Sequence, residues 1–195
     1  RDRIVERINN FEDDLYIVGQ TPSDSLDIQS FPFAPNPLVV LASRDHPLVG
    51  KKNISLEDIA KEPLVLREPG SGIRDATLRL FENAGLKPNV RMELGSNEAI
   101  KHAIVGGLGI SVLSLHTLAL EGAHGPVSLL DVEGFPIMRQ WYMVHPKGKE
   151  LSLVAKAFLD FALKFEPQMR ARLLDQWPEL ADDLNKTKPA ARAPR

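Results

Sequence analysis

The sequence predicts an α/β protein built mainly on parallel sheet, and three observations support this fold class. Apolar segments of strand length alternate with segments striped at helical spacing along nearly all of the 195 residues. Residues 38–42 form a continuous apolar run, which is typical of a strand covered on both faces in a parallel sheet. Residues 63–84 indicate a strand, a glycine loop and a helix in succession, which is the building unit of such folds.

The first third of the chain predicts two helices and three strands. Apolar residues recur at helical spacing over residues 4–11, and a short apolar strand follows at residues 15–19. Residues 28–33 are expected to be extended because their proline is incompatible with a helix interior. After the strand at residues 38–42, the sequence Ser-Leu-Glu-Asp matches a helix-capping pattern and predicts a short helix over residues 55–61.

The middle of the chain contains two successive units of a strand, a loop and a helix. Residues 63–66 predict a strand, residues 67–72 a loop, and residues 73–84 a helix that a glycine ends. Residues 90–94 alternate as a strand, and cap residues then lead into a helix over residues 97–105. We therefore expect two strand-to-helix junctions in this part of the chain.

The last third predicts two strands, a long helix and a tail. Residues 110–113 form a buried strand, and a looser glycine-rich stretch separates them from a strand at residues 140–144. An apolar stripe predicts a helix over residues 151–162. Residues 185–195 hold four basic residues, no acidic ones and two prolines without apolar periodicity, so we expect a disordered basic tail there.

The composition excludes several classes of protein. The 24 Lys and Arg residues against 26 Asp and Glu residues give a formal charge of −2, which provides no bulk field for a nucleic-acid backbone. The absence of cysteine excludes disulfide scaffolds, thiolate zinc sites and cysteine nucleophiles, and it fits a reducing compartment. No apolar run approaches the roughly 20 residues that a membrane helix needs. We expect a cytoplasmic protein that does not contact a membrane.

The first candidate site is the loop that leads into the helix at residue 73. Glycines on both sides of Ser71 let the backbone approach a ligand, and the helix N-terminus that follows favours an anion. Ser71 adds a hydroxyl group and Arg74 a fixed positive charge. The alternative is that Gly70 and Gly72 only serve a tight turn. The second junction, around Asn97, offers an amide side chain, although a helix cap alone also explains it.

Catalytic and cofactor motifs are weak. The five histidines show no metal-ligand spacing, so we expect no metal site. The glycine-rich run at residues 106–109 fails the dinucleotide pattern, because it follows a helix and Val112 occupies the last position. We expect no cofactor, and we assign its glycines to ending a helix and to close packing of the next strand. A serine hydrolase that uses Ser71 has no base placed beside the nucleophile, so we name no catalytic residue.

Several stretches, in this order and spacing over residues 1–165, resemble a known family. They are Asp-Leu-Tyr-Ile-Val-Gly at 14–19, Pro-Leu-Val-Val at 37–40, Asp-His-Pro-Leu at 45–48, Ser-Leu-Glu-Asp-Ile at 55–59, Arg-Glu-Pro-Gly-Ser-Gly-Ile-Arg at 67–74, and Val-Gly-Gly-Leu-Gly-Ile-Ser-Val-Leu at 105–113. The chain resembles the effector-binding domain of LysR-type transcriptional regulators. Its Arg-Glu-Pro-Gly-Ser-Gly loop is similar to that of the CbbR group, which regulates RuBisCO and carbon-fixation operons.

The resemblance implies a two-lobed fold like the type 2 periplasmic binding proteins, with mainly parallel sheets and an effector cleft between the lobes. The implied division gives lobe one residues 1–43 and 141–165, lobe two residues 44–140, and a C-terminal extension residues 166–184. The first strand of lobe one would be missing. The family positions that match the effector site are Ser71, Gly72, Ile73, Arg74 and Asn97.

The resemblance also implies partners. The effector would be a small anionic metabolite, such as a phosphorylated sugar or a related acid. Promoter DNA would be bound only through an N-terminal winged helix-turn-helix that these residues lack, by a homodimer or homotetramer. The alternatives are a solute-binding protein of the same fold and, with less support, a small α/β serine hydrolase.

Overall fold

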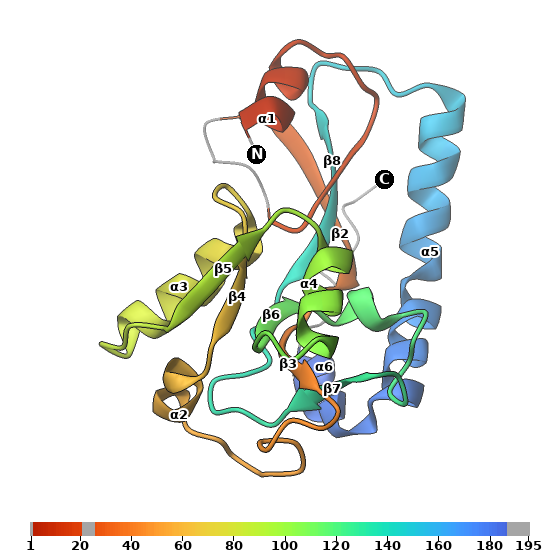
Figure 1. Cartoon of the computed structure of the whole chain (residues 1–195). Coiled ribbons are helices and arrows are strands. Elements are labelled where there is room, and N and C mark those ends of the chain that lie inside the picture. Colours follow the sequence, from red (N-terminus) through yellow and green to blue (C-terminus); the bar gives the residue numbers. More distant parts are fainter. Residues whose placement is uncertain (1, 21–25, 187–195) are drawn as a thin grey trace. The chain divides into compact units, whose positions relative to one another are not determined.

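The computed structural model describes residues 2–20 and 26–186 and is an α/β structure (Figure 1). The chain divides into two compact units, which we call unit 1 (Arg1–Asn36 and Arg139–Arg195) and unit 2 (Pro37–Met138). These limits fall before residues 43 and 140, where the sequence placed the lobe boundaries. The strand at residues 38–43, which we had placed in lobe one, therefore belongs to unit 2, because both of its neighbouring strands lie there.

Unit 1 is built on one antiparallel sheet. Its strands lie in the order β1 (Tyr16–Val18), β8 (Gln140–Pro146) and β2 (Ile28–Pro35), so that β8 pairs with both others. The short helix α1 (Asp2–Asn9) precedes β1, and the long helix α5 (Leu153–Gln176) lies along β2 (Figure 1). The core between α5 and this sheet contains Phe33, Ala34, Met143, Leu159 and Ala162.

The C-terminal part of unit 1 is helical well beyond residue 162. Helix α5 continues to Gln176, and a short turn η2 (Pro178–Leu180) leads into α6 (Ala181–Lys186). Apolar side chains at helical spacing are buried through this region: Leu173, Trp177, Leu180 and Leu184. Residues 185 and 186, which we had assigned to a disordered tail, end α6, while residues 187–195 lie outside the described part of the chain.

Unit 2 contains a three-stranded antiparallel sheet and a parallel pair. Strand β3 (Leu38–Ser43) lies between β6 (Ser111–Ser114) and β7 (Val127–Leu130) and runs antiparallel to both. Strands β4 (Leu64–Arg67) and β5 (Val90–Leu94) are the only parallel pair of strands within the described ranges. The remaining elements of unit 2 are α2 (Leu56–Lys61), α3 (Gly72–Asn83), α4 (Asn97–Val105) and η1 (Leu115–Leu118).

The expected predominance of parallel sheet is therefore wrong, although the α/β class is correct. Strand β3 is buried along almost its whole length, as its apolar run predicted. Burial on both faces does not determine the direction of the neighbouring strands, however, and those of β3 run antiparallel. Strand β7 was missed because it is short and lies in a glycine-rich stretch.

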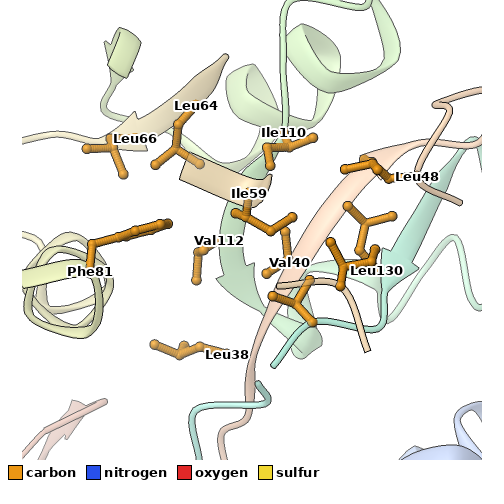
Figure 2. Packing of buried hydrophobic residues seen from close by; sticks show 13 residues of the cluster. Leu38, Val40, Leu48, Ile59, Leu64, Leu66, Phe81, Ile110, Val112 and Leu130 are labelled. Carbon is orange, nitrogen blue, oxygen red and sulfur yellow. The ribbon is translucent and has the colours of Figure 1, made fainter. Parts of the chain in front are cut away.

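The core of unit 2 fixes the helix that begins at the candidate site. Figure 2 shows Phe81 of α3 beside Leu66 of β4 and Val112 of β6. All three side chains belong to one buried apolar cluster. Burying a side chain of this size stabilises the fold by roughly 1.5–3 kcal/mol. Helix α3 is thereby held against the end of β4, which fixes the connection between them.

The glycine run at residues 106–109 has the packing role that we assigned to it. Gly106 is the C-terminal cap of α4, and its N–H donates to the carbonyl of His102 at 2.9 Å. Gly109 has a φ of +148°, and a Cβ atom there would lie 2.1 Å from the carbonyl oxygen of Pro63. The chain can pass this close to β4 only with glycine at this position.

Candidate functional site

The candidate site lies where β4 and β5 end. Because these strands are parallel, their carboxyl ends meet at the same edge, with Arg67 opposite Leu94. Strand β4 leads through a short loop into α3, and β5 leads into α4. Ligands of open α/β sheets bind at this kind of edge. The fold thus brings the junction of Ser71 to Arg74 beside the junction of Asn97.

The serine at the start of α3 differs from the other helix-capping serines. Ser55, Ser96 and Ser152 each accept a hydrogen bond from a backbone N–H of the helix that they begin, at 3.1, 3.4 and 3.2 Å. Ser71 has the backbone conformation of an N-cap, but its side chain accepts no such bond from the described backbone of α3. The Ser71 hydroxyl is thus not used to begin the helix.

The loop before Ser71 requires one glycine. Gly70 has a φ of +86°, in the left-handed region that favours glycine, and the N–H of Ser71 then donates to the carbonyl of Glu68 at 3.2 Å. The turn delivers Ser71 and Gly72 to the start of α3. Ile73 packs against the core of unit 2 and so anchors this end of the helix, offering no polar side-chain group to a ligand.

Arg67 joins the two junctions. Its guanidinium group donates to both carboxylate oxygens of Glu68, from Nε at 2.7 Å and from Nη2 at 2.9 Å. Its Nη1 donates to the Oδ1 atom of Asn97 at 2.7 Å. The hydrogen bond from Arg67 is the largest cause that lowers the pKa of Glu68, so this carboxylate stays ionised.

Arg74 is also paired. Its Nη1 atom lies 2.5 Å from a carboxylate oxygen of Glu93 and donates to the carbonyl of Arg67 at 3.2 Å. The site therefore contains two arginines and two glutamates, whose formal charges cancel. The fixed positive charge that we expected from Arg74 is balanced by Glu93. Any recognition of an anion at this edge would therefore depend on hydrogen-bond donors in defined positions rather than on net charge.

Sequence reasoning found one side of this network and missed the other. Arg67 and Glu68 lie in the candidate loop but were assigned no role, and Glu93 was not identified. The links from Arg67 to Asn97 and from Arg74 to Glu93 depend on the pairing of β4 with β5. One signal was available, since Arg67 is a charged residue directly after the buried strand residues 64–66. Glu93 lies beside it only through the strand register, in which it pairs with Leu66.

Neither a metal-ligand cluster nor a membrane-spanning helix occurs in the part of the chain that the structure describes. Residues 2–20 and 26–186 contain no group of three His, Cys, Asp or Glu side chains placed to hold a metal ion. In the same ranges, no helix combines the length and the hydropathy needed to cross a bilayer.

The fold defines a class of protein, namely a two-lobed α/β domain. The LysR substrate binding domain family matches residues 1–166. The chain therefore belongs to this family of transcriptional-regulator domains, as the sequence motifs predicted.

Curated relatives support the membership of this family. The chain is 56% identical over 161 residues to the HTH-type transcriptional activator CmpR of a Synechocystis strain, covering 83% of this chain and 53% of that protein. It is 47% identical to the RuBisCO operon transcriptional regulator of Acidithiobacillus ferrooxidans, covering 83% of this chain and 52% of that protein. The chain thus spans about half the length of these relatives. The second of these names confirms the resemblance to regulators of RuBisCO operons.

A solved structure supports the fold. The regulatory domain of CcmR from Synechocystis PCC6803, in complex with 2-PG, superposes with a TM-score of 0.80 at 49% identity. The match covers 86% of this chain and 80% of that chain. The two-lobed fold like the periplasmic binding proteins is thereby confirmed. The matching relatives are transcriptional regulators, so neither the solute-binding nor the hydrolase alternative gains support.

Proposed function

We propose that this chain is the effector-sensing domain of a LysR-type regulator of carbon-fixation genes and binds a small anionic metabolite at the edge of β4 and β5. The residues that we assign to the ligand are Ser71, Gly72, Arg74 and Asn97, with Ile73 anchoring the loop. The similarity to a regulatory domain described with 2-PG supports this class of ligand. Binding would shift the domain between conformations and so alter how the whole regulator sits on DNA.

One observation supports the site most strongly. Ser71 occupies an N-cap position, yet its hydroxyl does not cap α3, whereas Ser96 at the neighbouring junction caps α4. A capping hydroxyl contributes about 1 kcal/mol to a helix. We infer that the Ser71 hydroxyl hydrogen-bonds a ligand oxygen at this edge and does not stabilise α3.

The test is a calorimetric titration of the 195-residue chain with 2-PG. Inorganic sulfate and an unphosphorylated sugar serve as controls for a general anion effect and for a general sugar effect. We expect saturable binding of 2-PG and none of either control at equal concentration. Absence of saturable binding by 2-PG would contradict the proposal, and equal binding of sulfate would reduce it to a general anion site.

The variant Arg74→Ala tests the assignment of this arginine. We expect it to weaken 2-PG binding by about tenfold or more, because a charge-assisted hydrogen bond contributes roughly 1.5–3 kcal/mol. The circular dichroism spectrum should not change, since Ile73 and Phe81 still hold α3 against the core of unit 2. Unchanged affinity would remove Arg74 from the site and leave the rest of the proposal intact.

The similarity to full-length transcriptional regulators supports further proposals about the whole protein. We infer that promoter DNA is bound by a winged helix-turn-helix outside these residues, that the regulator acts as a homodimer or homotetramer, and that it works in the cytoplasm. We assign it no enzymatic activity and no cofactor. A gel-shift titration with a carbon-fixation promoter, with and without 2-PG, would test the coupling between effector and DNA.

A further inference from the structure

We propose that Arg67 is a positioning residue, which orients the side chain of Asn97 so that its amide donates hydrogen bonds to an anionic oxygen of the effector. This inference rests on the proposed function, because it names the recognition chemistry of the same site. It makes the pair Arg67 and Asn97 a determinant of specificity for ligands that present acceptor oxygens, such as a carboxylate or a phosphate.

The contact with Arg67 fixes the orientation of the Asn97 amide. A guanidinium group has five N–H donors and no acceptor. The atom of Asn97 that faces Arg67 at 2.7 Å must therefore be the carbonyl oxygen Oδ1, because the amino group would meet donor against donor. The Nδ2 amino group then lies on the far side of the amide from Arg67, with two N–H donors.

Arg67 is itself held in place. Both carboxylate oxygens of Glu68 accept hydrogen bonds from Arg67 in a bidentate ion pair, and only 18% of the Arg67 side chain is exposed. Its backbone is fixed in β4 by pairing with β5, and its carbonyl accepts from Arg74. A group anchored on three sides transmits a defined geometry to Asn97, which a flexible lysine would not.

Asn97 has hydrogen-bond donors available for a ligand. Among the described residues, no group accepts a hydrogen bond from its Nδ2 atom, whereas its Oδ1 atom is occupied. Ser96, the preceding residue, caps α4, so Asn97 is not needed for that task. Asn97 is partly buried at the start of α4. An amide whose acceptor is used and whose donors are not selects a ligand rich in acceptors.

The experiment is a double-mutant cycle on 2-PG affinity with the variants Arg67→Met and Asn97→Ala and their combination. If Arg67 acts through Asn97, each single change weakens binding by about tenfold and the double variant is no weaker than Asn97→Ala alone. Additive losses, near a hundredfold, would show that Arg67 contacts the ligand independently and would overturn the inference.

Two further measurements separate positioning from charge and from folding. Arg67→Lys keeps the positive charge but loses the planar guanidinium group with its several donors. We therefore expect this variant to lose almost as much affinity for 2-PG as Arg67→Met does. Retained affinity in Arg67→Lys would assign Arg67 a purely electrostatic role and contradict the inference. The side-chain amide signals of Asn97 in a nitrogen-15 NMR spectrum should shift when 2-PG is added to the unmodified chain, and they should not shift in Arg67→Met.

The outcomes distinguish the inference from the proposed function. If the unmodified chain binds 2-PG while the Asn97 amide signals and the affinity of Asn97→Ala stay unchanged, the inference fails and the proposed function stands. If the unmodified chain does not bind 2-PG at all, the proposed function fails and the inference fails with it. If Arg67→Met does not fold, the Asn97 signals and the Arg67→Lys variant decide the question.

Discussion

Individual residues at the two junctions have separable tasks, and serine substitutions can separate them. Ser96→Ala removes a capping hydrogen bond from α4 and should lower the free energy of unfolding by about 1 kcal/mol. Ser71→Ala removes no cap, so we expect unchanged stability but weaker 2-PG binding. Urea denaturation and calorimetric titration of both variants provide the measurements. A stability loss in Ser71→Ala equal to that in Ser96→Ala would show that Ser71 serves the helix after all.

Gly109 should be the least replaceable glycine of its run. In Gly109→Ala the new Cβ atom would overlap the carbonyl oxygen of Pro63, so either β4 or the start of β6 must move. We expect a loss of about 3 kcal/mol or more, as is typical of strained backbone positions. Gly107→Ala is the matched control, because Gly107 also has a positive φ, of +71°, but open space around it. Its loss should be about 1 kcal/mol. Equal denaturation midpoints for the two variants would contradict the steric argument.

At the scale of elements, a buried lysine connects α4 to η1 and to the segment that follows it. The Nζ atom of Lys101 donates to the carbonyl of Thr117 at 3.0 Å and pairs with Glu121 at 2.5 Å and Glu98 at 2.9 Å. Lys101→Met removes these bonds and leaves Glu121 unpaired, so we expect a loss of about 2 kcal/mol in the free energy of unfolding. The control is Lys61→Met, whose exposed pair with Asp58 should contribute nothing measurable. A loss in Lys61→Met as large as that in Lys101→Met would contradict the view that the buried ion pairs contribute more to stability than the exposed one.

The stability difference between the unmodified chain and Lys101→Met should depend on pH in a defined direction. Burial lowers the pKa of Lys101, but hydrogen bonds and attraction from Glu121 and Glu98 together raise this pKa above its ordinary value of 10.5. The hydrogen bond from Lys101 lowers the pKa of Glu121 below its ordinary value of 4.5. The pair therefore stabilises the fold fully between these two values. Its contribution is lost as pH falls through the folded pKa of Glu121 or rises through that of Lys101. Thermal melts between pH 3 and pH 10 should show the difference shrinking in acid, and a constant difference would contradict this assignment.

The strands also show what apolar patterning can and cannot predict. The run at residues 38–42 correctly predicted a buried strand, because burial of both faces leaves no polar alternation. It did not predict that β6 and β7 would flank this strand in the antiparallel direction, since direction depends on distant segments meeting in space. By contrast, the Ser55 cap of α2 was predictable because the accepting hydroxyl and the backbone N–H that donates to it lie within one turn.

At the scale of the whole molecule, the sequence located the candidate site but not its network. Ser71 and Asn97 were identified because each lies at a local strand-to-helix junction, which short-range signals describe. The links from Arg67 to Asn97 and from Arg74 to Glu93 join residues far apart in the chain and follow from the parallel register of β4 and β5. The balance of charge at the site was therefore invisible until the strands were paired.

Residues 167–186, which follow the family match, are predicted to contribute to the stability of the folded chain. The family match ends at residue 166, yet burial continues to Leu184, which is fully buried, and the guanidinium of Arg170 both pairs with Glu166 and donates to the Leu184 carbonyl. If residues 167–186 belong to the folded molecule, Leu184→Ala should cost about 2–5 kcal/mol, as large-to-small changes in a core do.

The matched control is Leu153→Ala, at a leucine that is 85% exposed although it lies inside the family match. Because surface changes of this kind stay within about 0.5 kcal/mol, its denaturation midpoint should equal that of the unmodified chain. A detached helical tail would reverse the expectation for Leu184→Ala, since removing its side chain would then leave the midpoint unchanged. Burial, rather than membership of the shared family region, thus decides which leucine the fold needs.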